Sequence, residues 1–103
     1  MRLTVTPTEI QECANRHIVR LRQLSFAELA ALPAFQEEVE TINELKVAVW
    51  INRDILEDGS IRIVVQAYFH RFLGIGTMAA DGFIIASNGT QTAVPQDMMW
   101  EFS

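Results

Sequence analysis

Cys13 and His17 are residue types that could do chemistry together. They lie four positions apart, so on a helix the two side chains share a face and are close enough to bind one metal ion. The same spacing permits a thiol nucleophile with a histidine base. A metal site needs more than two ligands, however, and the only other histidine is His70. Because Cys13 also falls on an apolar helix stripe, we predict an inert buried thiol, with no metal site and no catalytic residue.

A glycine-rich pattern at 74–79, GIGTMA, matches the dinucleotide-binding fingerprint GxGxxA. That fingerprint needs a helix that begins at the glycines and a parallel strand after the helix. Asp81-Gly82 and a run of strand-forming residues follow instead, and too little chain remains for the rest of the motif. The pattern therefore predicts a turn that leads into a strand, and no cofactor is expected.

Aromatic and polar residues of the second half could line a binding surface. Trp50 belongs to one predicted strand, whereas Gln66, Tyr68 and His70 alternate along the next. Aromatic rings with hydrogen-bonding tips are typical of small-molecule sites, of protein interfaces and of packing at the edge of a core. The apolar tail should dock on the sheet or on a neighbouring subunit. The candidate ligand-binding or interface residues are Trp50, Gln66, Tyr68, His70, Met99, Trp100 and Phe102.

The stretch 61–73, IRIVVQAYFHRFL, is the predicted central strand of an antiparallel sheet. Every second residue from Ile61 to Phe69 is apolar and should face the core, whereas the other parity is amphipathic. Thirteen extended residues would span about 43 Å, against a radius of gyration of about 13 Å for a domain of this size. We therefore expect a bend near His70-Arg71.

The turn Glu57-Asp58-Gly59 sets the register of the first hairpin. A three-residue loop with Gly59 in a left-handed conformation pairs Val49 with Ala67 and Ile51 with Val65. This register should win over a two-residue loop because it collects the aliphatic side chains on one face. It also groups Trp50, Gln66, Tyr68 and His70 on the other face.

The first half reads as helical. Thr6 and Pro7 fit a helix start, and Ser25 to Glu28 fits a capping box. Pro33 should open a third helix, with Phe35, Val39 and Ile42 as its apolar line and Glu37, Glu38 and Glu40 on its wet side. A type I′ turn is expected at Asn88-Gly89. We expect helices over 7–24, 26–32 and 33–42, and strands over 45–56, 61–73, 77–87 and 91–94.

The chain has 103 residues, of which 50% are hydrophobic, and a formal net charge of −5. This length fits one domain, and so much apolar surface favours an oligomer interface or a ligand cavity, with a homodimer as the expected state. The acidic balance argues against binding of a nucleic-acid backbone, and one cysteine excludes an internal disulfide. Without a signal peptide or an apolar run of membrane length, a cytoplasmic protein is expected.

Several short segments resemble parts of known proteins. RIVVQAYF, ADGFI, the NGT turn and the C-terminal MWEFS are similar to segments of small uncharacterised α+β proteins, some of them encoded in mobile integron gene cassettes. The resemblance covers roughly Ile61 to Phe102 and leaves out the helical half. It implies a compact, often oligomeric bacterial domain without an assigned activity, and it transfers no catalytic residue.

Taken together, the sequence predicts one α+β domain over residues 1–103: three N-terminal helices within 7–42 pack on one face of a four-stranded antiparallel β-meander within 45–94, and a tail follows over 95–103. The leading hypothesis for function is a non-enzymatic, homodimeric accessory or interaction protein. A small-molecule-binding protein or minor enzyme with a pocket between sheet and helices is one alternative. An acidic inhibitor of a basic partner protein is another. Neither nucleic acid nor a membrane is expected as a partner.

Overall fold

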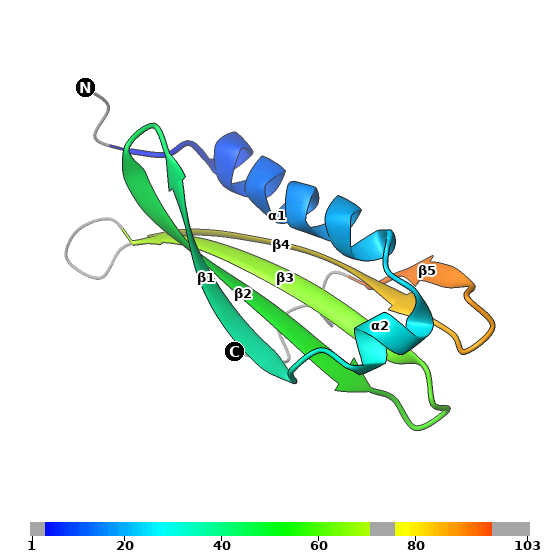
Figure 1. Cartoon of the computed structure of the whole chain (residues 1–103). Helices are drawn as coiled ribbons and strands as arrows, with labels where there is room; N and C mark the ends of the chain where they lie inside the picture. Colours follow the sequence, from blue (N-terminus) through cyan, green and yellow to red (C-terminus); the bar gives the residue numbers. More distant parts are fainter. Residues whose placement is uncertain (1–3, 71–75, 96–103) are drawn as a thin grey trace.

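An antiparallel sheet of five strands, with two helices on one of its faces, makes up the part of the chain described by the computed structural model, residues 4–70 and 76–95 (Figure 1). The strands follow one another in the sheet in chain order. The fold class is therefore α+β, as predicted, with one helix fewer and one strand more than expected. In chain order the elements are α1 (Pro7–Arg22), α2 (Phe26–Ala30), β1 (Phe35–Ile42), β2 (Leu45–Ile55), β3 (Ile61–His70), β4 (Gly76–Ile85) and β5 (Gln91–Ala93).

Both helices begin where the sequence predicted. The Thr6 hydroxyl accepts a hydrogen bond from the Glu9 amide at 3.2 Å, and the Glu9 carboxylate accepts one from the Thr6 amide at 3.0 Å. Ser25 and Glu28 form the same reciprocal cap at the start of α2. The apolar stripe of α1 is buried against β3 and β4, and Figure 1 shows the helix lying over these strands. Its buried residues are Ile10, Cys13, Ala14, Ile18 and Leu21.

The predicted third helix over 33–42 is wrong, because residues Phe35–Ile42 form β1 and pair with β2 along their whole length. Phe35, Val39 and Ile42 recur at helical spacing, which imitates an apolar helix stripe. In the strand, alternate residues are more exposed, and Phe35 and Val39 stay 56% and 64% exposed. Pairing with β2 therefore outweighs the local helical pattern.

The loop between β1 and β2 supports this assignment. Asn43 and Glu44 both have positive φ, 51° and 70°, as a two-residue type I′ hairpin loop requires. A left-handed backbone is accessible to asparagine but costs a glutamate about 1 kcal/mol. Neither residue is glycine, so the sequence carried only a weak signal for this hairpin.

The predicted register of the next hairpin is confirmed. Val49 pairs with Ala67 and Ile51 with Val65. Gly59 has a φ of 84°, and its amide donates to the Leu56 carbonyl at 2.9 Å, which closes the predicted three-residue loop. In contrast, the predicted type I′ turn at Asn88-Gly89 is wrong. Only Gly89 there has positive φ, and the loop repeats the hydrogen-bond pattern found at Gly59.

Strand boundaries after β3 agree with the predictions within a few residues. The glycine-rich pattern continues into β4 from Gly76 onward, so a strand follows the glycines and not a helix. The bend expected near His70-Arg71 falls at residue 71, which lies outside the described residues. Met99, Trp100 and Phe102 of the predicted tail lie outside them as well.

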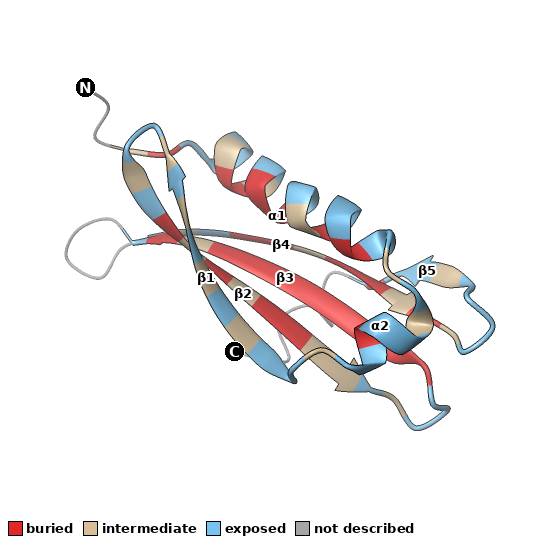
Figure 2. Ribbon diagram, viewed as in Figure 1, coloured by how far each residue is buried: buried red, intermediate tan, exposed pale blue. Residues whose placement is uncertain are grey.

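Two apolar clusters lie on opposite sides of the sheet. The larger one joins the inner side of α1 and α2 to the sheet and includes Val49, Val65 and Ala67, which therefore face the helices as predicted. Figure 2 shows this buried stripe on α1 and along β3. The smaller cluster, on the face away from α1, contains Val64, Ala80 and Val94. We call that second face the open face, because neither of the helices among the described residues lies on it. In the described part of the chain, no helix is long and apolar enough to span a membrane.

Candidate functional site

The open face brings together three of the predicted site residues. The rings of Trp50 and Tyr68 stack with centroids 5.7 Å apart and planes 15° apart. The Tyr68 hydroxyl shares a hydrogen bond of 3.0 Å with Nδ1 of His70. Gln66 belongs to the same face but is only 3% exposed, and its side-chain oxygen accepts from the Asn52 amide at 3.5 Å. Gln66 therefore lies beneath the surface, and the surface itself is formed by the two aromatic rings and His70.

Gly76 fixes the position of the Tyr68 ring. The two residues lie on adjacent strands, and a Cβ atom built on Gly76 would be 2.6 Å from Cζ of the Tyr68 ring. The ring therefore lies over the glycine, where any side chain would displace it. This arrangement explains why a glycine begins β4 beside an aromatic residue.

A partly exposed apolar row crosses four strands on the open face. Register pairs Val39 with Ala48, Ala48 with Tyr68, and Tyr68 with Met78. Val39 is 64% exposed and Met78 is 38% exposed. We call this row, together with the neighbouring Phe35 and Trp50, the open-face patch; its members are Phe35, Val39, Ala48, Trp50, Tyr68 and Met78.

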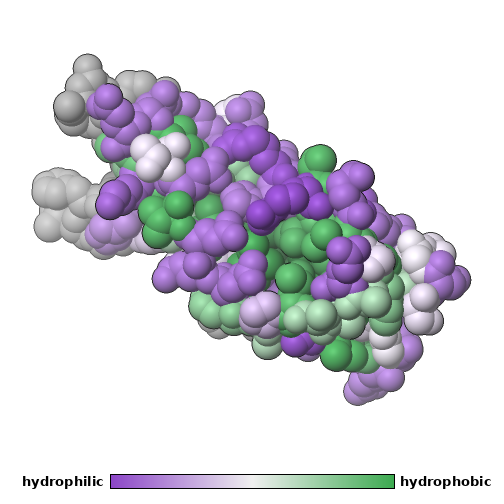
Figure 3. Space-filling model, viewed as in Figure 1, coloured by the Kyte–Doolittle hydropathy of each residue, from purple (hydrophilic) through white to green (hydrophobic). Residues whose placement is uncertain are grey.

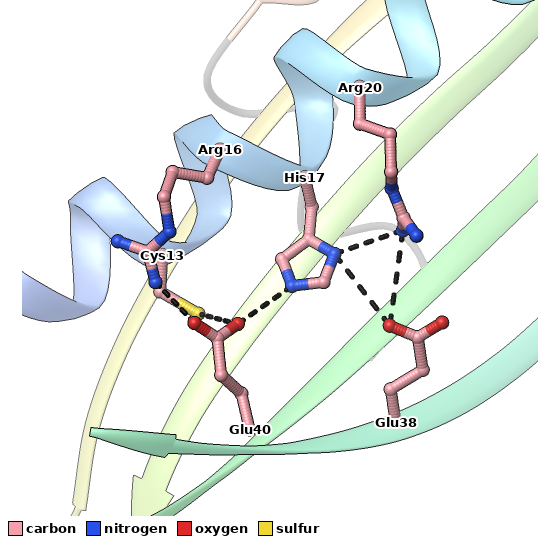
Figure 4. A network of polar contacts seen from close by, with 6 residues as sticks. All are labelled: Cys13, Arg16, His17, Arg20, Glu38 and Glu40. Carbon is pink, nitrogen blue, oxygen red and sulfur yellow. Dashed lines mark hydrogen bonds and ion pairs between the residues drawn. The ribbon is translucent and has the colours of Figure 1, made fainter.

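A second polar cluster, which the sequence did not predict as a unit, joins α1 to β1 (Figure 4). Glu40 is its centre. Oε2 of Glu40 accepts a hydrogen bond from the Cys13 thiol at 3.3 Å and one from Nε2 of His17 at 2.9 Å. Oε1 of Glu40 forms an ion pair with Arg16. The α1–β1 network, as we call it, consists of Cys13, Arg16, His17, Arg20, Glu38 and Glu40.

The far side of the His17 ring is held by the rest of this network. Nη2 of Arg20 lies 3.1 Å from Nδ1 of His17, and Oε2 of Glu38 lies 3.7 Å from the same nitrogen. A guanidinium can only donate, so in the neutral ring Nδ1 is the acceptor and Nε2 carries the proton. Both histidine nitrogens are thus engaged: Nε2 donates to Glu40 and Nδ1 accepts from Arg20.

Burial changes the acidity of two groups here. Removal of the Cys13 thiol from solvent raises its pKa to about 12, and the Glu40 carboxylate beside it acts in the same direction. Burial alone would also raise the pKa of Glu40, but the hydrogen bonds from His17, Arg16 and Cys13 outweigh it and hold that pKa below its ordinary value. The cluster therefore combines a protonated thiol with an ionised carboxylate at neutral pH.

The sequence missed this cluster because it assigned 33–42 to a helix. On a helix Glu38 and Glu40 would lie on the solvent side, whereas on a strand residues two apart point to one face. That face is the one covered by Arg16, His17 and Arg20 of α1. The available signal was the match between a basic helix edge and two acidic residues at strand spacing.

Two hollows in the described surface lie on the α1 side. One of about 230 Å³ is lined by Arg16, His17 and Arg20, and an open depression of about 690 Å³ lies along the outer side of α1 between Glu12 and Gln23. Figure 3 shows hydrophilic side chains gathered along α1, with apolar side chains visible below them. Trp50, Tyr68 and His70 face the other way, so a ligand that reached them would bind on the open face and not between helix and sheet.

Comparisons of the chain with models of protein families, with curated proteins and with solved structures gave no match. The two clusters are therefore interpreted from their geometry and chemistry alone.

Proposed function

We propose that the protein is a non-enzymatic interaction module that forms a homodimer, with the open-face patch of two copies packed together. The single observation that supports this proposal is the exposed apolar row from Val39 to Met78 across four strands. Contiguous apolar surface of this kind, with tryptophan and tyrosine at its centre, is typical of protein interfaces. The composition also favours a homodimer, and the resemblance implies an often oligomeric domain.

The chemistry at the border of the patch suits a second copy of the same chain. Lys46 lies on one side of the row, two residues before Ala48, and Glu37 lies on the other side, paired with Trp50. A two-fold axis along the row, between two sheets packed face to face, exchanges these sides. The Lys46 side of one copy then meets the Glu37 side of the other, so the borders have opposite charge.

The net charge of the chain also favours dimerisation through the open-face patch. Two copies with a formal charge of −5 each repel one another at most points of contact. One charged side chain, Glu37, lies between Phe35 and Val39 on this face, and in the two-fold arrangement it faces the Lys46 side of the other copy, so contact there limits this repulsion. A contact through the acidic edge strand β1 would instead set Glu38 and Glu40 of two copies against each other.

The test is the molecular mass in solution, measured by light scattering and by sedimentation over a range of micromolar concentrations. We expect a dimer for the natural protein. Val39→Asp and Met78→Asp place a charge in the apolar contact and should each weaken association at least about tenfold. Val19→Asp is the matched control, because Val19 is 61% exposed on α1 while Val39 is 64% exposed on β1.

A monomer at the highest concentration would overturn this proposal, as would equal loss of dimer in Val19→Asp and Val39→Asp. A small-molecule site on the same aromatic surface predicts a different result. In that case the natural chain is a monomer, and a ligand from a thermal-shift screen raises its melting temperature until Tyr68→Ala and His70→Ala remove the effect.

A further inference from the structure

We propose that Cys13, His17 and Glu40 bind a divalent transition-metal ion, with zinc as the best fit, between α1 and β1. The three donor atoms are a thiol sulfur, an imidazole nitrogen and a carboxylate oxygen, and they lie within 4.8 Å of one another. This is a ligand set that zinc uses in proteins. It comes from two elements far apart in sequence, so it exists only in the folded chain.

The spacing of the donor atoms is close to that of a loaded site. With ordinary zinc–ligand lengths in a tetrahedron, sulfur and oxygen ligands lie about 3.6 Å apart, and nitrogen and oxygen ligands about 3.4 Å apart. In the folded chain, Cys13 Sγ lies 3.3 Å and His17 Nε2 lies 2.9 Å from Oε2 of Glu40. These two pairs therefore need to separate by only a few tenths of an ångström to admit the ion, and Sγ and Nε2 lie within 4.8 Å of each other.

Charge is balanced by the same three residues. A thiolate and a carboxylate together neutralise the two positive charges of the ion, while the imidazole stays neutral. The thiol proton leaves to solvent when the sulfur binds the metal. The Nε2 proton of His17 is replaced by the metal, and a proton resides on Nδ1 instead.

Glu38 lies beside the ring nitrogen of His17 that does not bind the metal. Its Oε2 lies 3.7 Å from Nδ1 of His17, on the side away from Glu40. A metal-bound histidine in proteins usually donates its other N–H to a carboxylate, which orients the ring and makes it a stronger ligand. Arg20, with a side chain that is 56% exposed, is free to move off Nδ1 when the tautomer changes.

Three protein ligands leave one position of a tetrahedral ion open. His17 and Glu40 side chains are 13% and 30% exposed, so solvent reaches the edge of the site. The hollow lined by Arg16, His17 and Arg20 lies beside it. Two guanidinium groups there favour water or a small anion as the fourth ligand.

A purely structural network is the competing explanation, because hydrogen bonds alone also tie α1 to β1. The two explanations differ at Cys13. A helix–strand tie is made by the ion pair and the histidine, and the thiol adds one weak hydrogen bond to it. A metal site instead depends on the sulfur as a ligand.

The experiment is titration of the reduced full chain with zinc by calorimetry, and with cobalt(II) by absorption spectroscopy. We expect one ion per chain and a thiolate-to-cobalt charge-transfer band in the near ultraviolet. Cys13→Ser should remove this band, and Glu40→Gln should weaken zinc binding by more than about 100-fold. Glu38→Gln leaves all three ligands in place and should weaken it about tenfold, the effect expected of a group that orients a ligand.

Matched controls come from the same strand and the same residue types. Glu37→Gln changes the neighbouring glutamate that faces away from α1, and His70→Gln changes the histidine of the open face; zinc binding should be unchanged in both. The proposal is overturned if the folded, reduced natural chain binds no stoichiometric zinc, or if Cys13→Ser and Glu40→Gln bind it as tightly as the natural chain. Circular dichroism of each variant shows that it is folded, and Glu38→Gln tests the site if a ligand variant does not fold.

Discussion

The two faces of the sheet distribute polar and apolar side chains in opposite ways. On the side of α1, the centre is an apolar core and the charged residues gather at the edge, between α1 and β1. On the open face, the apolar residues Phe35 and Val39 of β1 are exposed, whereas polar residues of β2 and β3 are buried. The buried polar residues of that face are Asn52, Arg62 and Gln66.

Arg62 shows how the open face accommodates a buried charge. Its side chain is 6% exposed, and Nη2 donates to Oδ2 of Asp54 at 2.7 Å across the β2–β3 pair. Val64, on the same strand and face, is fully buried. Residue type does not set burial on this face, and burial also changes along one strand: on β3, Val64 is buried whereas His70 is exposed. Strand parity thus predicts on which face of the sheet a side chain lies, but it does not predict whether that side chain is buried there.

The largest effect is expected for the reactivity of Cys13, which tests how closed the α1 side is. Burial raises the pKa of the thiol to about 12 from an ordinary value of 9.0, so the thiol stays protonated at mildly alkaline pH. Only the thiolate reacts with iodoacetamide. A shift of three pH units lowers the thiolate fraction roughly a thousandfold. Mass spectrometry should therefore show alkylation of Cys13 in guanidinium but almost none in the folded chain.

The chemical reactivity of the two histidines also measures how accessible each side of the sheet is. His17 has a side chain that is 13% exposed, whereas His70 is on the open face and exposed. Diethylpyrocarbonate should modify His70 before His17. Rapid alkylation of Cys13 in the folded chain, or equal modification of both histidines, would mean that the α1 side is as accessible as the open face.

Val64 and Val39 lie on the open face, but Val64 is buried and Val39 is exposed. Val64→Ala deletes fully buried methyl groups and should lower the free energy of unfolding by about 2 kcal/mol. Val39→Ala, at an exposed position on the same face, should change it by less than about 0.5 kcal/mol. Urea denaturation at a fixed protein concentration below that of dimer formation measures both. Equal losses would contradict the difference in burial between Val39 and Val64.

A smaller loss of stability than for Val64→Ala is expected for Gly76→Ala. A Cβ atom there overlaps the end of the Tyr68 side chain, which can move aside, so the cost in stability should be about 0.5–1 kcal/mol. The Trp50–Tyr68 stack should be lost, and near-ultraviolet circular dichroism should change accordingly. Gly59→Ala is the contrasting variant: no atom lies near its Cβ, but a φ of 84° makes alanine unfavourable there. It should destabilise the hairpin without changing the aromatic signal.

Local signals in the sequence were enough to predict much of this fold. The capping residues Thr6 and Ser25 indicated the helix starts, and Gly59 with the aliphatic residues around it indicated the register that unites Trp50, Tyr68 and His70. These features depend on a few neighbouring residues or on one hairpin. The placement of these side chains on one face could therefore be predicted from the amino-acid sequence alone.

The features that could not be predicted depend on contacts between distant segments. Phe35–Ile42 has an apolar spacing that fits a helix, and only pairing with β2 makes it a strand. Glu40 joins Cys13 and His17 only because this segment is a strand, so a helical assignment hid the cluster. The error at Asn88-Gly89 is smaller, since the turn was predicted in place and only its type was wrong.

The position of β1 at the border of the sheet has a consequence for aggregation. In the described sheet this strand has a single neighbour, so one row of its backbone amides and carbonyls can extend the sheet with another chain. Three acidic side chains within eight residues, Glu37, Glu38 and Glu40, oppose such growth by repulsion between chains. Acid that protonates these carboxylates removes the repulsion, and fibril formation at low pH would then begin from this strand.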